Sequence, residues 1–90
     1  MDLAFKKSFL KSIKKLKDKS LKDDIFDAIN SAEKAQTLDE ILNIKKLTGY
    51  SIYYRIRIGD YRIGLKWVDV ERILYFVTVD HRKDVYKNFP

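Results

Sequence analysis

The chain has 90 residues, of which 46% are hydrophobic, enough for one small core and too few for a second domain, so we expect a single domain spanning residues 1–90. It has no Cys and one His, which excludes disulfides, a thiolate nucleophile and the usual transition-metal clusters; we expect neither a metal nor a cofactor. The net charge of +6 favours anionic partners, and the lack of a long apolar run predicts a cytoplasmic protein without a membrane segment.

The first half of the chain has the pattern of helices. Residues 2–5 fit either a short strand or the lead into a helix. Apolar residues then recur at helical spacing within residues 6–17, with lysines on the other side, which predicts an amphipathic helix. Ser20 and Asp23 have the spacing of a capping box, so we expect a second helix to begin at Leu21.

The second half has the alternating pattern of strands. Residues 52–58 and 61–67 alternate apolar and polar positions around Gly59-Asp60, a two-residue hairpin signal with glycine first. Residues 73–79 are apolar on both faces and predict a central strand covered on both sides. The predicted fold class is therefore α+β, with two N-terminal helices packed on one face of a small antiparallel sheet.

The hairpin register brings three arginines onto one face of the sheet. If Gly59-Asp60 is the loop, Arg57 lies opposite Arg62 and Arg55 lies opposite Gly64. Like charges directly opposite in a sheet are destabilising. Gly64 removes a side chain from the middle of this face, so we expect a gap that an anion can enter. The alternative is an outer face whose arginines are only solvated.

Three sequence blocks resemble the RelE/ParE superfamily of toxins from type II toxin–antitoxin modules. They are KLTG at 46–49, YRIRIGDYRI at 54–63 and HRKDVY at 81–86, in the family's order and spacing. The resemblance implies the RelE-like fold. It also implies a cognate antitoxin as partner, with an acidic or amphipathic segment, and a possible toxin–antitoxin heterotetramer.

The RelE-like branch cleaves mRNA in the ribosomal A site, without metal, by attack of a ribose 2′-OH on the adjacent phosphate. By resemblance, Arg55 and Arg57 take the places of two active-site basic residues that are often lysines. Arg62 and Arg82 match the phosphate-contacting arginines, and Tyr86 matches a tyrosine that stacks on a base or assists proton transfer. The implied partners are the ribosome and mRNA.

The arginines leave open which group accepts a proton. Arginine cannot lose its proton at any working pH, so we expect His81, or a neighbour that the cluster activates, to accept it. We also expect four lysines to contact RNA or ribosome: Lys11, Lys14, Lys15 and Lys66. Two other functions stay open, namely a ParE-like inhibitor of DNA gyrase and a catalytically inactive binding module of a repressor complex.

Overall fold

The computed structural model describes all residues from Met1 to Pro90. Its elements in chain order are β1 (Asp2–Phe5), α1 (Lys7–Lys15), α2 (Lys19–Lys34), the 3-10 helix η1 (Leu38–Glu40), β2 (Ile44–Lys46), β3 (Tyr53–Ile58), β4 (Tyr61–Val68), β5 (Ile73–His81) and α3 (Val85–Asn88). None of the helices is both long and apolar enough to cross a membrane.

The five strands form one sheet in the order β1-β5-β4-β3-β2. Strands β2 to β5 form the expected antiparallel meander, but β1 pairs with β5 in parallel, so the sheet is mixed and not purely antiparallel. Four residues of β1 carry too little periodicity to name their partner, and a parallel neighbour needs a crossover, here supplied by the helices and the meander. The α+β prediction is otherwise confirmed.

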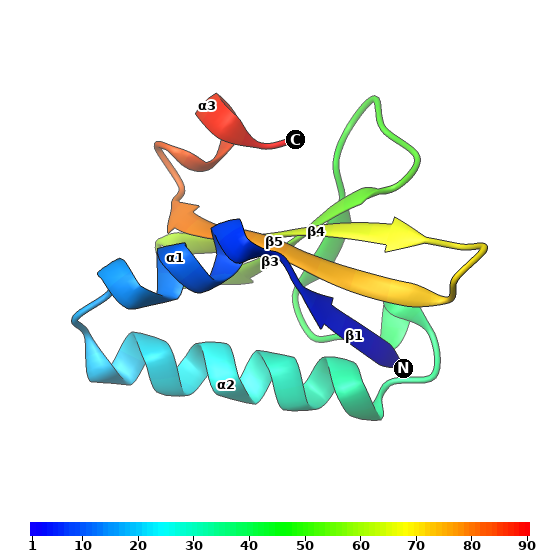
Figure 1. The fold of residues 1–90 in the computed structure, drawn as a ribbon, viewed down its shortest axis with the longest axis horizontal. Helices are drawn as coiled ribbons and strands as arrows, with labels where there is room; N and C mark the ends of the chain where they lie inside the picture. Colours follow the sequence, from blue (N-terminus) through cyan, green and yellow to red (C-terminus); the bar gives the residue numbers. More distant parts are fainter.

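We expected both N-terminal helices on one face of the sheet, and this holds for α2 but not for α1, which lies at an edge (Figure 1). Helix α2 runs across one face, whereas α1 follows β1 and continues along the free edge of β5 (Figure 1). There the Ser8 hydroxyl donates to the Val77 carbonyl, which replaces part of the missing strand ladder. The expected capping box at Ser20 is wrong, because Asp18 is the N-cap and its carboxylate accepts the Leu21 N–H at 3.1 Å.

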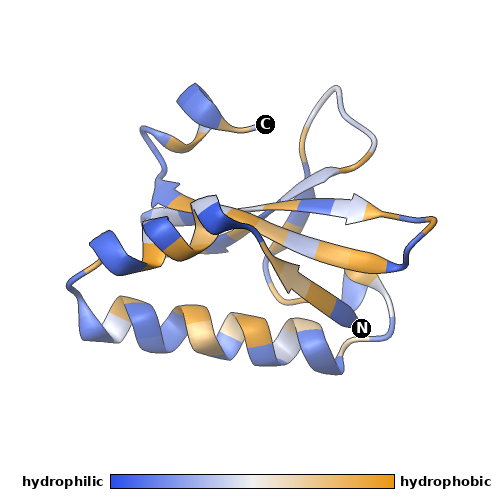
Figure 2. Cartoon of the chain, viewed as in Figure 1, coloured by the Kyte–Doolittle hydropathy of each residue, from blue (hydrophilic) through white to orange (hydrophobic).

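The core lies between the sheet and the helices. Phe9 of α1 and Ile25 of α2 pack against Ile63 and Phe76, and all four are almost completely buried. Figure 2 shows apolar residues alternating with polar ones along these elements. This pattern is expected where one face of a helix or strand packs in the core and the opposite face is exposed to solvent.

A second, smaller cluster covers part of the opposite face of the sheet. The C-terminal segment turns back after β5, and Val85 and Phe89 pack there with Leu47. Figure 1 shows α3 and the C-terminus on the side of the sheet away from α2. The central strand β5 is therefore covered on both faces in part, as its apolar sequence predicts.

Candidate active site

The predicted hairpin register is confirmed residue by residue. Arg57 lies opposite Arg62 and Arg55 opposite Gly64, and Gly59 begins the turn with a φ of +55°. The register continues onto β5, where Asp80 lies opposite Arg62. One face of the sheet thus carries Arg55, Arg57 and Arg62. Asp80 stands at the end of the row formed by Arg57 and Arg62, and the sequence pattern did not identify it as a candidate.

Backbone carbonyls hold two of these arginines. Arg55 donates to the Asn43 carbonyl at 2.9 Å, and Arg62 donates through one nitrogen to the Gly59 and Tyr61 carbonyls at 2.8 and 2.9 Å. Neither forms an ion pair, so their positive charge is not neutralised within the chain. Carbonyl contacts orient a guanidinium while leaving its charge available to an anion.

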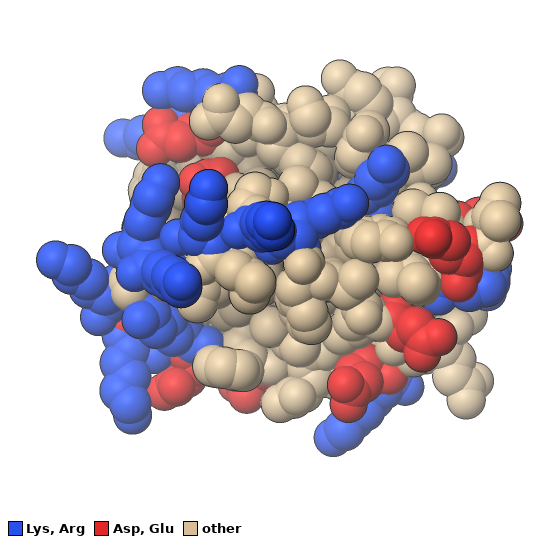
Figure 3. Space-filling view, viewed as in Figure 1, with Lys and Arg blue, Asp and Glu red and all other residues tan.

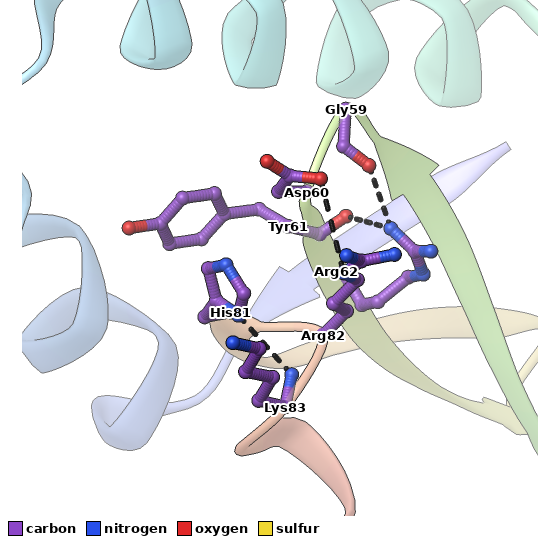
Figure 4. Close-up of polar contacts among 7 residues, drawn as sticks. All are labelled: Gly59, Asp60, Tyr61, Arg62, His81, Arg82 and Lys83. Atoms are coloured by element: carbon purple, nitrogen blue, oxygen red, sulfur yellow. Dashed lines mark hydrogen bonds and ion pairs between the residues drawn. The ribbon is translucent and has the colours of Figure 1, made fainter.

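Arg82 reaches the same region from the end of β5. Its backbone N–H donates to the Asp60 carbonyl at 2.8 Å, and its Nε lies 3.8 Å from the Asp60 carboxylate. Figure 4 shows the Arg82 guanidinium beside Arg62, between that residue and Asp60. The hairpin loop therefore anchors the segment that follows β5, and it partly neutralises Arg82.

The surroundings of Arg62 lower the pKa of its guanidinium. Burial lowers the pKa of Arg62 below its ordinary value, and the positive charges of Arg55, Arg57 and Arg82 lower it further. The Tyr86 phenol acts in the opposite sense on this pKa. Arg55, Arg57, Arg82 and Tyr86 thus all lie close enough to act on Arg62, and these residues form what we call the arginine face: Arg55, Arg57, Arg62, Arg82 and Tyr86.

Gly64 does not leave the open gap that the sequence suggested. A Cβ atom at this position would lie 2.9 Å from ring carbons of Phe89, which covers the glycine. Phe89 is 3% exposed and also packs edge-to-face on Tyr53, with ring centroids 5.6 Å apart. The chain's own C-terminal segment fills the space that we expected an anion to enter, and the glycine is needed for this aromatic contact.

Tyr86 stays outside this packing. Its side chain is 55% exposed, three residues before the buried Phe89. It lines an open cleft of about 460 Å³ together with Arg55, Lys45, Lys46 and Tyr50, among other residues. Basic and aromatic side chains around one cleft suit a single-stranded nucleic acid, because the cations bind phosphates and the rings stack on bases.

His81 lies apart from the arginine face. It pairs with Tyr61 in the ladder row next to that of Arg62, so its side chain projects from the other face of the sheet. Its ring packs edge-to-face on Tyr61, with centroids 5.4 Å apart, and its Nδ1 accepts the Lys83 N–H at 3.2 Å (Figure 4). The structure therefore does not bring the expected proton acceptor to the arginines.

None of the four predicted lysines belongs to the arginine face. Lys11, Lys14 and Lys15 are exposed on α1, and Figure 3 shows basic side chains gathered at the α1 end of the molecule. Lys66 lies on β4 in the row beyond Gly64, opposite Tyr53. No three His, Cys, Asp or Glu side chains come together in an arrangement that could hold a metal ion.

Comparison with known proteins identifies the family. The model for the ParE toxin of type II toxin–antitoxin systems matches residues 3–86. The toxin RelE3 of Methanocaldococcus jannaschii is 38% identical over 91 residues, and the match covers the whole of both chains. The chain belongs to the RelE/ParE superfamily of toxins. Its similarity to a protein named RelE along the full length supports the RelE-like assignment.

Solved structures of this superfamily have the same fold. The chain matches the toxin in the RelB–RelE antitoxin–toxin complex from Methanococcus jannaschii with a TM-score of 0.80 and 36% identity, covering 97% of this chain and 99% of that one. The chain also matches the RelE–RelB complex from Pyrococcus horikoshii OT3, with a TM-score of 0.72 and 20% identity. That match covers 90% of this chain and 93% of the other. The predicted RelE-like fold is thus confirmed.

Proposed function

We propose that this toxin is a ribosome-dependent endoribonuclease that cleaves mRNA in the A site without a metal ion. The observation that carries the proposal is the arginine face, whose residues line two open clefts: Arg55 and Tyr86 line one, and Arg57, Arg62 and Arg82 line the other. Such a cluster costs stability, because like charges oppose each other directly across β3 and β4. A bound phosphate would remove that cost.

The chemistry requires positive charge where the phosphorane develops. The substrate's 2′-oxygen attacks the adjacent phosphorus, negative charge grows on the non-bridging oxygens, and the bond to the 5′-oxygen breaks. Arg62 and Arg82 supply donors for those oxygens, and Arg55 and Arg57 hold the flanking phosphates. Tyr86 stacks on a base or protonates the leaving oxygen from its exposed position in the cleft.

The test is cleavage of a defined mRNA on purified ribosomes programmed with an empty A site. Purified toxin should cut the mRNA within the A-site codon and leave a 2′,3′-cyclic phosphate and a 5′-hydroxyl. Naked mRNA should react far more slowly, because the ribosome orients the strand. No cleavage at any toxin concentration would contradict the proposal.

Ribosome binding should use the lysines of α1 as positioning contacts. Lys11, Lys14 and Lys15 are exposed on α1, the helix that runs along the free edge of β5 (Figure 1). Each phosphate contact adds roughly 0.7 to 0.9 to the slope of log affinity against log salt. Charge reversal at all three should flatten this slope and leave the rate on saturated ribosomes unchanged.

Inhibition of DNA gyrase is the second candidate, because the matching family model is that of ParE toxins. This function requires a protein-binding surface and no nuclease site. A supercoiling assay with purified gyrase separates the two functions: inhibition without mRNA cleavage favours the gyrase inhibitor. If the toxin showed neither activity, the inactive binding module would be favoured.

The cognate antitoxin is the expected protein partner, since solved relatives are complexes of toxin with antitoxin. An apolar groove of about 210 Å³ between α1 and α2 offers a site for an amphipathic antitoxin helix. Leu10 and Phe26 on its rim are 50% and 64% exposed, which is unusual for large apolar side chains in a free domain. The net charge of +6 favours an acidic partner.

The double substitution Leu10→Asp and Phe26→Asp should abolish neutralisation by the antitoxin while leaving mRNA cleavage intact. Val70→Asp is the matched control, because Val70 is 96% exposed at the β4–β5 turn and lies outside the groove. Co-expression with the antitoxin should rescue growth for the control and for the unchanged toxin only. Light scattering of the purified pair would show whether the complex is a heterotetramer.

A further inference from the structure

An acid, Asp80, lies directly opposite Arg62 in the sheet, and neither the family resemblance nor the sequence pattern assigned it to the site. We infer that Asp80 is the general base that takes the proton from the attacking 2′-hydroxyl, an inference that rests on the proposed nuclease function. Arginine cannot act as a base, and His81 projects from the other face of the sheet. Asp80 is the acid that lies in the same ladder row as Arg57 and Arg62.

A β-bulge places Asp80 there. The register between β4 and β5 shifts at Gly64/Leu65, so that Leu65 pairs with Phe76 but Gly64 pairs with Thr78, and Val77 is the extra residue. Without this extra residue, Val79 would lie opposite Arg62 and Asp80 would project from the other face. Bulges occur often beside active sites, where they redirect a side chain.

The carboxylate of Asp80 is held by one oxygen and free at the other. Its Oδ2 accepts the Thr78 hydroxyl at 2.6 Å, and the Thr78 hydroxyl lies 3.2 Å from that of Ser12 on α1. Its Oδ1 has no hydrogen-bond partner in the protein, and Asp80 forms no ion pair. The side chain is half-buried. A carboxylate oriented through one oxygen leaves the second to accept a proton.

Asp80 Oδ1 takes the 2′-hydroxyl proton, the 2′-oxygen forms a bond to phosphorus, and the bond from phosphorus to the 5′-oxygen breaks. The 5′-oxygen takes a proton from the Tyr86 phenol, and solvent exchange later restores both side chains. Directly opposite residues in adjacent strands have Cβ atoms about 4.5 to 5.5 Å apart, so the proposal places the ribose of a phosphate bound at Arg62 on the side of Asp80.

The test is single-turnover mRNA cleavage on saturated ribosomes by Asp80→Asn. The amide oxygen can still accept the Thr78 hydroxyl, so the fold should persist, and the rate should fall by about 10²- to 10⁴-fold. Asp69→Asn is the control, because it removes the same charge at the β4–β5 turn and should cleave at the wild-type rate. If Asp80→Asn folds poorly, Asp80→Glu replaces it: a carboxylate displaced by about 1 Å should slow cleavage by about 10- to 10²-fold.

A substrate with sulfur in place of the 5′-bridging oxygen identifies the role. Sulfur leaves without a proton, so it rescues the loss of a general acid and not the loss of a general base. Asp80→Asn should stay slow on this substrate, whereas Tyr86→Phe should recover. Rescue of Asp80→Asn, or a wild-type rate in either Asp80 variant, would overturn the inference. If the wild-type toxin itself cleaved nothing, the proposed function would fall, and the inference with it.

Discussion

The contact between Gly64 and the Phe89 ring makes Gly64→Ala an informative substitution. The new Cβ would lie 2.9 Å from the ring carbons. Carbon atoms in favourable contact are about 3.5 to 4.0 Å apart, so the ring has to move by more than half an ångström or leave. Tyr53 packs against the same ring and limits how far it can shift. We expect the C-terminal segment to detach at least in part.

The expected change in the free energy of unfolding follows from the burial of Phe89 that is lost when the C-terminal segment detaches. Full burial of one phenylalanine contributes about 1.5 to 3 kcal/mol, and Phe89 is 3% exposed. Replacing glycine in a strand by alanine by itself raises the stability of the fold by roughly 0.5 to 1 kcal/mol, because glycine loses more backbone freedom on folding than alanine does. Gly64→Ala should therefore lower the free energy of unfolding by about 1 to 2 kcal/mol.

Urea unfolding followed by Trp67 fluorescence measures this value, and a double-mutant cycle assigns its cause. In the Phe89→Ala background the clash is absent, so Gly64→Ala should be neutral or stabilising by up to about 1 kcal/mol. The same cost in both backgrounds would show that the Phe89 ring is not the reason for a glycine here. Because Tyr86 lies three residues before Phe89, Gly64→Ala should also slow mRNA cleavage.

Three further predictions test other parts of the structure. Asp18→Ala removes the N-cap of α2 and should cost about 0.5 to 2 kcal/mol in urea unfolding, whereas Ser20→Ala should cost less than half of that. Arg57→Gln should stabilise the fold by about 0.2 to 1 kcal/mol by relieving repulsion with Arg62; Arg72→Gln, which breaks a 3.0 Å ion pair with Asp69, should not. Tyr86→Phe should slow cleavage more than tenfold, because the phenol protonates the leaving oxygen, and an unchanged rate would assign the residue to stacking.

The hairpin could be predicted from the sequence because its information is local. Gly59-Asp60 fixes a two-residue turn, and this turn fixes every pair between β3 and β4, including the opposed Arg57 and Arg62. The helices are predictable from their apolar spacing for the same reason. The residue at which a helix begins is harder to predict. Asp18 and Ser20 both offer a side-chain oxygen that could cap α2, and the backbone geometry determines that Asp18 is the N-cap.

The remaining features depend on contacts between distant parts of the chain. The parallel pairing of β1 with β5 joins residues about seventy positions apart and leaves no mark in a four-residue strand. The bulge at Val77 changes which residues of β5 face the arginines, and alternation alone cannot place it. Phe89 on Gly64 is equally long-range, although a glycine inside a strand together with a terminal aromatic residue is a signal worth examining.

The central claim, that the arginine face is a nuclease site, is tested most directly by single-turnover cleavage of A-site mRNA with Arg62→Ala and Arg82→Ala at saturating toxin. Loss of one preorganised donor to the developing phosphorane should slow each variant by about 100- to 1,000-fold, with little change in ribosome affinity. Replacement of either residue by Lys should recover only part of the rate, because the charge stays while the bidentate geometry is lost. Wild-type rates in both alanine variants would contradict the claim.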